Sequence, residues 1–288
     1  MKILIIGATG CLGPHIVDEI VKNEFTPILL GRELNKIESF KRHQQIEVDL
    51  LKLKVENLPT DIDSIIYLAQ SRNFRNFPEM SDDIFTINTL LPYQIAKWVQ
   101  KNNIKNFTYF STGAVYKNTD GLPKKEDSEL SLFSNNFYAN SKLSAEQLIS
   151  SFKNSIKSLK IIRPFFIFGP YQSEDMLIPR LFLNVQNGKD IMIDTNGGVK
   201  INPIFAPDAA KIIIPQIFND GFEVLNLAGK EEINIKDIAT YFSSILKQSP
   251  VFKLNDANAL PLIGDIAKTK NYEYQPLKES LSKISETL

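Results

Sequence analysis

The sequence is poor in the residues that build disulfides and metal centres. Its 288 residues include one cysteine, Cys11, and two histidines, His15 and His43. A single thiol cannot close an internal disulfide, so nothing indicates an oxidising compartment. Structural zinc sites use about four Cys or His ligands, so we expect no metal site. Cys11 is interpreted as a small packing residue.

Excess charge and long apolar runs are lacking as well. Lys+Arg and Asp+Glu balance at 33 each, so no surplus of one sign favours nucleic acid or an acidic membrane surface. No apolar run approaches the ~18–20 residues that span a bilayer. A predicted strand begins at Lys2, which leaves no room for a signal peptide before it. We therefore expect a soluble, cytoplasmic protein that binds neither nucleic acid nor membranes.

Short apolar runs alternate with helical patterns along the first 164 residues. This order is typical of an α/β fold in which helices cover both faces of a parallel sheet. The predicted strands are Lys2–Ile6, Thr26–Leu30, Gln45–Val48, Ser64–Leu68, Asn106–Phe110 and Leu159–Ile162. The predicted helices lie near residues 12–23, 83–103 and 136–154.

A glycine-rich turn joins the first predicted strand to the first predicted helix. The opening residues MKILIIGATGCLG place Gly7, Gly10 and Gly13 there, in a GxxGxxG spacing. Gly7 permits the tight turn, Gly10 the close approach of a pyrophosphate, and Gly13 the packing of helix on strand. The positive end of the helix then faces the anion. This context predicts a dinucleotide site.

The alternation of strand and helix weakens after Pro164. It returns later, with a helix after Pro207 and a strand over Glu223–Leu227. We expect a Rossmann-type, doubly wound dinucleotide-binding domain made of residues 1–164 plus about 201–228. The remaining segments, about 165–200 plus 229–288, are expected to form a smaller, discontinuous C-terminal substrate lobe near the carboxyl ends of the strands.

The spacing Tyr-x-x-x-Lys occurs three times, and two occurrences have simple structural explanations. Tyr274 and Lys278 enclose Pro276, which would break the helix that puts both side chains on one face. Tyr93 and Lys97 lie on an amphipathic helix and are interpreted as a packing or surface pair.

The third occurrence, Tyr138 with Lys142, carries the predicted chemistry. Its helix follows a strand that ends in FSTGAVY, which brings Ser111 and Thr112 to the carboxyl edge of the sheet. A free tyrosine has a pKa near ~10, and an ammonium group one helical turn away lowers that pKa. Thr112 can hold a carbonyl or alcohol oxygen against the phenol. With a nicotinamide ring beside them, these groups can move a hydride and a proton.

Several motifs follow one another in the order of a known family. They are GATGCLG (7–13), Asp49-Leu50 after the third strand, YLAQ (67–70), STGAVY (111–116), YANSK (138–142) and RPFFIFGP (163–170). On these motifs the chain resembles the extended short-chain dehydrogenase/reductases, the NAD(P)-dependent epimerase/dehydratase family. That family includes nucleotide-sugar epimerases, dehydratases and 4-ketoreductases. The resemblance covers residues 1–230 and extends loosely over the remainder.

The resemblance implies roles for the matching residues. Tyr138 is the general acid/base, Lys142 binds the nicotinamide ribose and tunes Tyr138, and Thr112 polarises the reacting oxygen. The implied cofactor-binding residues are Gly7, Thr9, Gly10, Cys11, Leu12, Gly13, Arg32, Asp49, Leu50, Leu68, Ala69, Gln70, Tyr138, Lys142, Pro164 and Phe165. The implied substrate contacts are Gln70, Thr112, Phe166 and Lys200. Arg72 is added to them because it follows the fourth predicted strand and can reach an anionic substrate.

Some of these implied contacts are specific. The Asp49 carboxylate meets the adenine amino group, and Gln70 lines the passage toward the nicotinamide. Phe165 packs near the nicotinamide carboxamide. Phe166 stands where UDP-galactose epimerases carry an asparagine that contacts the substrate diphosphate.

Cofactor choice depends on the end of the second strand. The chain has Leu30-Gly31-Arg32 there, and its first carboxylate is Glu33. A carboxylate at the strand end binds the ribose 2′-OH of NAD, whereas an arginine accepts the 2′-phosphate of NADP. Arg32 therefore favours NADP(H), with NAD as the alternative.

Departures from the family pattern narrow the implied reaction. Gly113 and Ala114 stand where the 4,6-dehydratases carry an acidic pair, and Cys11 lies in the cofactor turn rather than at a site for carbon-acid chemistry. The main prediction is a ketoreductase acting on a nucleotide-activated sugar. A nucleotide-sugar 4-epimerase is the first alternative, and a non-catalytic NADP(H)-binding regulatory protein is the second.

The family also suggests an oligomer. Helices near 83–103 and 136–154 commonly form a dimer interface in relatives. The apolar positions Leu143, Leu148 and Ile149 permit a homodimer of this kind, and core packing explains them equally well.

Overall fold

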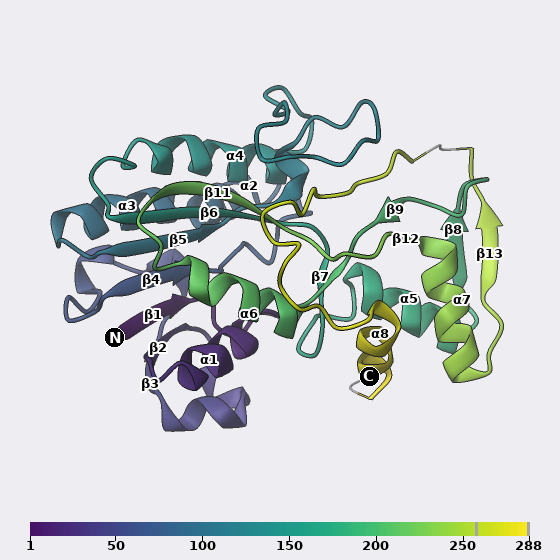
Figure 1. The fold of residues 1–288 in the computed structure, drawn as a ribbon, viewed down its shortest axis with the longest axis horizontal. Coiled ribbons are helices and arrows are strands. Elements are labelled where there is room, and N and C mark those ends of the chain that lie inside the picture. Colours follow the sequence, from purple (N-terminus) through teal and green to yellow (C-terminus); the bar gives the residue numbers. More distant parts are fainter. Residues whose placement is uncertain (257–258, 287–288) are drawn as a thin grey trace.

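A seven-stranded parallel sheet forms the centre of the molecule (Figure 1). The computed structural model describes residues 1–256 and 259–286. Its sheet has the order β11-β6-β5-β4-β1-β2-β3, which confirms the predicted doubly wound α/β fold. The strands are β1 (Lys2–Ile6), β2 (Thr26–Gly31), β3 (Gln44–Glu47), β4 (Ser64–Tyr67), β5 (Asn106–Phe110), β6 (Ser158–Pro164) and β11 (Gly221–Leu227).

Both faces of this sheet are buried, because the strands carry apolar side chains on each face. In β1, Ile3 and Ile5 join the hydrophobic cluster on one face, while Leu4 and Ile6 join the cluster on the other. Side chains alternate along a strand, so a continuous apolar run fits a sheet covered on two sides.

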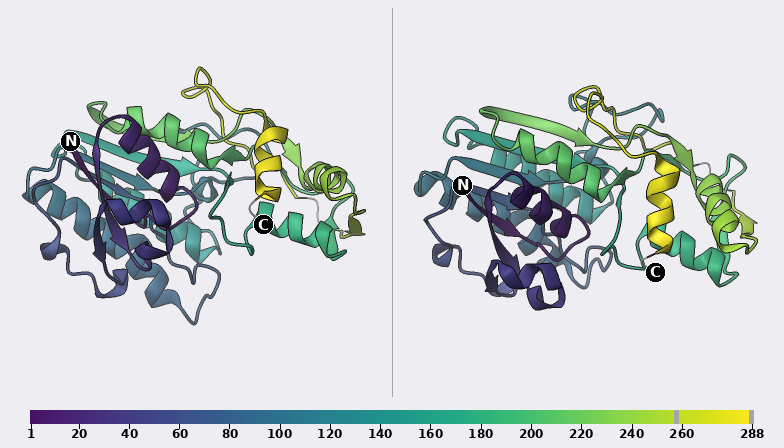
Figure 2. Two further views of the ribbon diagram at one scale, coloured as in Figure 1. Left: turned by 90° about the horizontal axis from the view of Figure 1, so that it is seen from below. Right: turned by 60° about the horizontal axis from the view of Figure 1, so that its bottom comes forward.

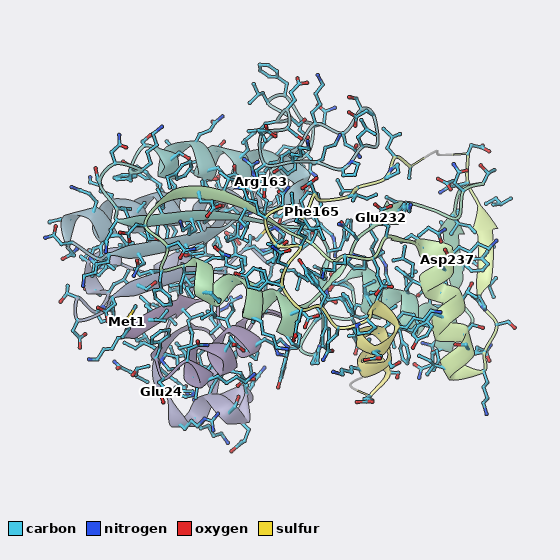
Figure 3. All side chains as sticks on the ribbon, viewed as in Figure 1. Met1, Glu24, Arg163, Phe165, Glu232 and Asp237 are labelled. Carbon is cyan, nitrogen blue, oxygen red and sulfur yellow. The ribbon has the colours of Figure 1, made fainter. Side chains whose placement is uncertain are left out.

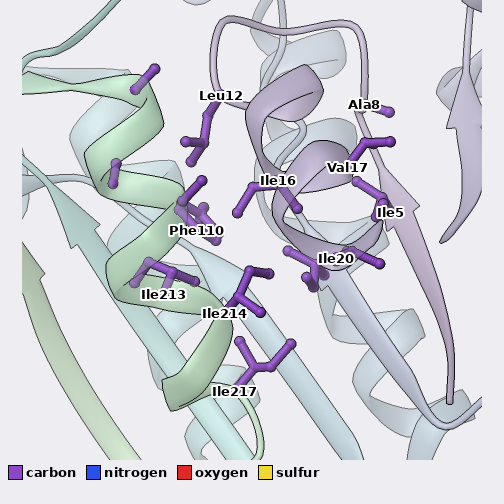
Figure 4. Close-up of a cluster of buried hydrophobic side chains, with 14 of the residues drawn as sticks. Ile5, Ala8, Leu12, Ile16, Val17, Ile20, Phe110, Ile213, Ile214 and Ile217 are labelled. Carbon is purple, nitrogen blue, oxygen red and sulfur yellow. The ribbon is translucent and has the colours of Figure 1, made fainter. Parts of the chain in front are cut away.

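Helices α1 (Gly13–Lys22) and α6 (Ala206–Gln216) cover the first face. Figure 4 shows Ile16 and Ile20 of α1 directed toward Ile213 and Ile214 of α6. Helices α3 (Leu91–Lys101) and α4 (Phe137–Ser150) cover the opposite face. Shorter helices are α2 (Ser81–Phe85), η1 (Leu34–Lys36), η2 (Glu38–Arg42), η3 (Leu50–Lys52), η4 (Val55–Asn57) and η6 (Gly113–Val115).

The helix predicted over residues 83–103 is interrupted. A π-helical turn, η5 (Thr86–Leu90), separates α2 from α3. The hydroxyl of Tyr67 on β4 donates to the Ile87 carbonyl at 2.6 Å, and that of Tyr109 on β5 donates to the Asn88 carbonyl at 2.9 Å. A π turn displaces backbone carbonyls from the regular helical ladder, and these two tyrosines satisfy them.

A smaller lobe lies to one side of the sheet in every view (Figures 1 and 2). It contains α5 (Leu177–Gln186), α7 (Ile235–Leu246), α8 (Leu277–Ser285) and the strand pairs β7/β10 (Ile167–Phe168, Ile204–Phe205), β8/β13 (Asp190–Ile193, Val251–Leu254) and β9/β12 (Lys200–Ile201, Ile233–Asn234). Phe168, Phe182 and Phe242 lie in its own hydrophobic cluster. Ile201 packs with this lobe, whereas Tyr272 and Tyr274 pack against the sheet's cluster.

Arg163 and Phe165 lie in the middle of the molecule, where the chain leaves β6 for the smaller lobe (Figure 3). Asp237 lies at the far end of that lobe, and Met1 and Glu24 lie at the opposite end of the molecule. Within residues 1–256 and 259–286, every helix is too short or too polar to cross a membrane.

Candidate active site

Four strands of the sheet end side by side, and several of the predicted site residues follow directly after them. Parallel pairing places Ile6 beside Leu30 and Tyr67, and Tyr67 beside Tyr109. The segments after these strand ends therefore share one edge, where doubly wound folds bind their ligands.

The glycine turn has the shape that a pyrophosphate site requires. Gly7 has φ +89°, and a Cβ there would lie 2.8 Å from the Ala69 backbone. A Cβ on Gly13 would lie 1.9 Å from the Ala8 carbonyl oxygen, whereas one on Gly10 would meet only the Gly7 oxygen at 3.6 Å. Gly7 and Gly13 are thus held by packing, and Gly10 faces open space.

The start of helix α1 also suits an anion. Its first turn carries no acidic residue, and no side chain of the described residues caps it. The Gly13 N–H donates to the Gly10 carbonyl at 3.0 Å and Pro14 carries no N–H, so the attraction for an anion comes mainly from the helix dipole, which favours negative charge at this end. The turn therefore fits the pyrophosphate of a dinucleotide.

The other predicted residues of the turn have packing roles or line it. Leu12 is buried, Thr9 is half-buried, and the N–H of Leu68 donates to the Ile6 carbonyl at 2.9 Å. Burial raises the pKa of the Cys11 thiol to about 12. Cys11 therefore stays protonated, in agreement with its interpretation as a packing residue.

The charged residues after β2 pair with charged residues that follow β3 and β4. Arg32 Nη1 lies 3.4 Å from Asp49 Oδ2, and Asp49 Oδ1 accepts from the Leu51 N–H at 3.1 Å. Arg72 Nη2 lies 3.7 Å from a carboxylate oxygen of Glu33. The loop after β4 thus turns Arg72 toward the end of β2, and its role as a substrate contact stays a prediction.

Tyr138, Thr112 and Gln70 come together from three segments of the chain. The Tyr138 hydroxyl donates to Gln70 Oε1 at 3.1 Å and forms a hydrogen bond with the Thr112 side chain. Thr112 is buried after β5, and its Oγ1 accepts from the Ala114 N–H at 3.2 Å. The Phe74 ring lies 5.2 Å from the Tyr138 ring. The phenol thus has a hydroxyl and an amide within reach.

Lys142 lies beneath this group and is fully buried. Its Nζ donates to the main-chain carbonyls of Phe110 at 2.8 Å and Ala69 at 3.4 Å. Burial lowers the pKa of Lys142 to about 7, with the Glu146 charge acting in the opposite direction.

The predicted lowering of the Tyr138 pKa is wrong for this structure. Burial raises the pKa of Tyr138, and the hydrogen bond from Thr112 offsets part of that rise. The physical reason is that burial disfavours both charges. Lys142 is only partly protonated near neutral pH, and it is held by carbonyl oxygens.

Helix α4 is fixed at the turn that carries the site. The Asn136 side chain caps its start by accepting from the Ala139 N–H at 3.3 Å. Asn88 Nδ2 donates to Ser141 Oγ at 3.1 Å, and Asn88 Oδ1 accepts from the Ser71 N–H at 2.9 Å. Asn88 therefore connects the helix of Tyr138 to the loop of Gln70.

Three predicted ligand contacts near the smaller lobe have other surroundings. The Phe165 ring is buried against Gly113 and Gly264 and stacks on Tyr116 at 5.9 Å. The predicted packing of Phe165 near the nicotinamide carboxamide stays a prediction. Phe166 is half-buried with φ +47°, and Lys200 Nζ lies 2.6 Å from Glu232. Pro164 is half-buried at the end of β6.

The loop after β4 also reaches the smaller lobe, which the sequence did not predict. Arg75 Nη1 lies 2.5 Å from Asp175 Oδ2, and the Arg75 guanidinium lies 4.6 Å from the Phe74 ring centroid. These partners are 100 residues apart. A polar loop without periodicity gives no signal for such a contact.

A surface pocket lies away from Tyr138, Thr112 and Gln70. It has a volume of about 450 Å³, follows the edge strand β11 and is lined by Lys160, Glu223 and Lys268, among others. Both ammonium groups already pair with Glu223, at 3.8 Å and 3.2 Å. We therefore assign it no ligand.

Comparison with known proteins identifies relatives of the whole chain. The sequence model of the "NAD dependent epimerase/dehydratase family" matches residues 3–228. The uncharacterized UDP-glucose epimerase YtcB of Bacillus subtilis is 26% identical over 311 aligned positions, which cover 98% of this chain and 96% of YtcB. The dTDP-D-glucose 4,6-dehydratase of Dictyostelium discoideum is 28% identical, over 81% of this chain and 62% of that protein.

A solved structure matches the fold over its full length. The UDP-glucuronic acid 4-epimerase of Bacillus cereus, in complex with UDP-glucuronic acid and NAD, aligns with a TM-score of 0.87 at 24% identity, with 100% of both chains covered. Fold and relatives together define an enzyme of the short-chain dehydrogenase/reductase type, which sets the non-catalytic alternative aside. The chain belongs to the NAD dependent epimerase/dehydratase family.

Proposed function

We propose that the protein is an NAD-dependent 4-epimerase of a nucleotide-activated hexose. The observation that carries this proposal is the Tyr138 phenol, hydrogen-bonded to Thr112 at the sheet edge that also holds the glycine turn. A phenol in that place can exchange a proton with a sugar hydroxyl.

Two features favour epimerisation over the alternatives in this family. YtcB and the B. cereus protein are both described as epimerases of UDP-sugars, which favours the 4-epimerase over the ketoreductase of the main sequence prediction. Gly113 and Ala114 offer no carboxylates for a 4,6-dehydration, and Cys11 is a half-buried thiol in the glycine turn whose pKa is raised.

The proton steps follow from the geometry. Tyr138 takes the proton of the sugar hydroxyl while that carbon is oxidised, and it returns the proton to the same oxygen when the ketone is reduced on its other face. Thr112 holds the reacting oxygen against the phenol in both steps. When bound, NAD would accept a hydride from the sugar carbon and give it back, so the reaction would consume no cofactor.

The cofactor we propose is NAD rather than NADP. The NADP(H) preference predicted from Arg32 is not confirmed. Arg32 is paired with Asp49, and the residue that follows Arg32 in the sequence is Glu33. A 2′-phosphate would compete with the Asp49 carboxylate for Arg32, whereas a ribose 2′-OH can donate to a carboxylate. The turn with Gly7, Gly10 and Gly13 would hold the pyrophosphate. Calorimetric titration should give a lower Kd for NAD than for NADP.

A direct assay tests the proposed reaction. Purified protein is incubated with UDP-glucose or UDP-glucuronate and catalytic NAD, and the sugars are followed by NMR. The 4-epimer should appear without accumulation of NADH. Steady consumption of NADPH with a 4-keto nucleotide sugar, and no 4-epimer, would instead establish the ketoreductase.

We also propose that the protein forms a homodimer through the helices near residues 83–103 and 136–154, which correspond to α2, η5 and α3 and to α4. Leu143 and Ile149 are buried in the core, so they cannot serve this interface. Leu148 on α4 and Phe85 on α2 are 43% and 47% exposed and lie on the same side of the sheet. These two residues now carry the proposal.

A further inference from the structure

We propose that Gln70 is a catalytic residue, whose side-chain amide partners the Tyr138 phenol both before and after the phenol gives up its proton. This inference rests on the proposed role of Tyr138. It assigns to a neutral amide the support that a lysine was expected to give.

The backbone on both sides of Gln70 is fixed. Ala69 packs so closely on Gly7 that a Cβ on the glycine would lie 2.8 Å from the Ala69 backbone, and the Ala69 carbonyl accepts from Lys142. On the other side, the Ser71 N–H donates to Asn88 Oδ1 at 2.9 Å. These contacts place the Gln70 side chain at the phenol, where its Oε1 accepts the hydroxyl proton at 3.1 Å.

The other polar groups around the Tyr138 phenol have partners of their own or offer a hydroxyl rather than an amide. Thr112 offers one hydroxyl, and Lys142 on the same helix donates to main-chain carbonyls. The Tyr109 ring lies 5.0 Å from the Lys142 ammonium, and Arg75 lies on the Phe74 ring. Glu146 lies one helical turn beyond Lys142 and pairs with Arg163. Gln70 is thus the amide in direct contact with the proton that moves.

An amide can serve both protonation states because it carries an acceptor and a donor. Its carbonyl oxygen accepts from the neutral phenol, and after a rotation of the amide its nitrogen donates to the phenolate. A carboxylate at this position can only accept and would repel the phenolate. A methionine side chain has a similar length, but its thioether neither donates a hydrogen bond to the phenolate nor accepts a strong one from the phenol.

The test compares Gln70→Glu and Gln70→Met with the wild type in the pH dependence of kcat/KM for 4-epimerisation. Oxidation needs the phenolate, so kcat/KM rises with pH through the Tyr138 pKa. In Q70E the added charge raises that pKa, and we expect the rising limb to move up by about one pH unit. In Q70M we expect kcat to fall about tenfold on this limb, with KM nearly unchanged.

Gln147→Glu is the matched control. Gln147 is exposed on α4, so this substitution adds the same charge away from the phenol. Its profile should coincide with that of the wild type. If the profiles of Q70E and Q70M also coincide with the wild type, Gln70 has no such role. A Q147E profile displaced as far as that of Q70E would likewise overturn the inference.

Tyr138→Phe separates this inference from the proposed function. If Y138F keeps wild-type turnover, the acid/base role of Tyr138 is wrong and the inference falls with it. If Y138F loses turnover while both Gln70 variants keep the wild-type profile, only the inference is wrong. Thermal unfolding of each variant checks that the fold is intact. Because Gln70 is exposed, we expect at least one of its two variants to fold normally.

Discussion

At the scale of single residues, burial and hydrogen bonds set the proton chemistry of the site. Burial lowers the pKa of Lys142 to about 7 and raises that of Tyr138. The Tyr138 phenol therefore favours its neutral form, and Lys142 is only partly protonated near neutral pH. Small polar contacts from Thr112 and Gln70 then determine how readily the phenol gives up its proton.

Replacing Tyr138 by phenylalanine removes the proton and keeps the ring beside Phe74. We expect kcat to fall by ~10² or more, because general acid–base catalysis contributes a factor of that size. NAD affinity, measured by calorimetry, should stay nearly unchanged. Wild-type kcat in this variant would remove Tyr138 from the mechanism.

The glycine turn offers a matched pair of substitutions. In Gly13→Ala the new methyl group would overlap the Ala8 carbonyl, so we expect a loss of about 1–3 kcal/mol in the free energy of unfolding. In Gly10→Ala the methyl group has space, so stability should change by less than about 0.5 kcal/mol, while NAD binds more weakly. Urea unfolding and calorimetry measure the two effects. Equal stability of G13A and the wild type would contradict this interpretation.

At the scale of elements, helix α4 is tied to the sheet by a buried ion pair. Arg163 on β6 donates to both carboxylate oxygens of Glu146, with Nη2 to Oε2 at 2.6 Å, and its Nη1 donates to the Tyr116 hydroxyl at 2.8 Å. Both partners of the ion pair are nearly inaccessible to solvent. This pair lies one turn beyond Lys142, so it sets the position of the site's helix.

Removing Glu146 should be costly. Glu146→Ala leaves the Arg163 guanidinium buried without its counter-charge, and we expect a loss of about 3–5 kcal/mol in the free energy of unfolding. The neighbouring exposed residue gives the control, since Gln147→Ala should change stability by less than about 0.5 kcal/mol. Urea unfolding measures both, and a loss below about 1 kcal/mol in E146A would show that the pair does not hold the helix.

Most elements could be predicted from the sequence, because their signal is local. Each predicted strand ends within two residues of the observed one. The break at Thr86–Leu90 could not, because the tyrosines that satisfy it, Tyr67 and Tyr109, lie on other strands.

The candidate site was predicted in part for the same reason. The glycine turn and the Tyr138 helix have fixed local spacings. Contacts between segments far apart in the sequence have no such spacing. An example is the contact of Gln70 with Tyr138, which are 68 residues apart. Arg72 was assigned to the substrate because it follows β4, but its loop turns it back to Glu33.

At the scale of the whole molecule, two lobes meet at the carboxyl edge of the sheet. Arg75 and Asp175 join the loop beside Tyr138 to the smaller lobe, and the segment that contains Gly264 packs on Phe165. The site thus lies where residues of both lobes approach one another.

The proposed homodimer gives a test at this scale. Leu148→Asp places a charge in the proposed interface, so light scattering should show the wild type at twice the mass of the chain and the variant at the single mass. Leu254→Asp is the control, because Leu254 is exposed on β13 in the smaller lobe. A monomeric wild type, or a dimeric L148D, would contradict the proposed interface.

The fate of the hydrogen on carbon 4 tests the central claim most directly. UDP-glucose carrying deuterium at that carbon is incubated with the enzyme and unlabelled NAD, and the product is examined by mass spectrometry and NMR. We predict a 4-epimer that keeps its deuterium at carbon 4, because the hydride leaves and returns within one bound complex. Loss of the label to free cofactor, or recovery of the substrate unchanged, would contradict the account.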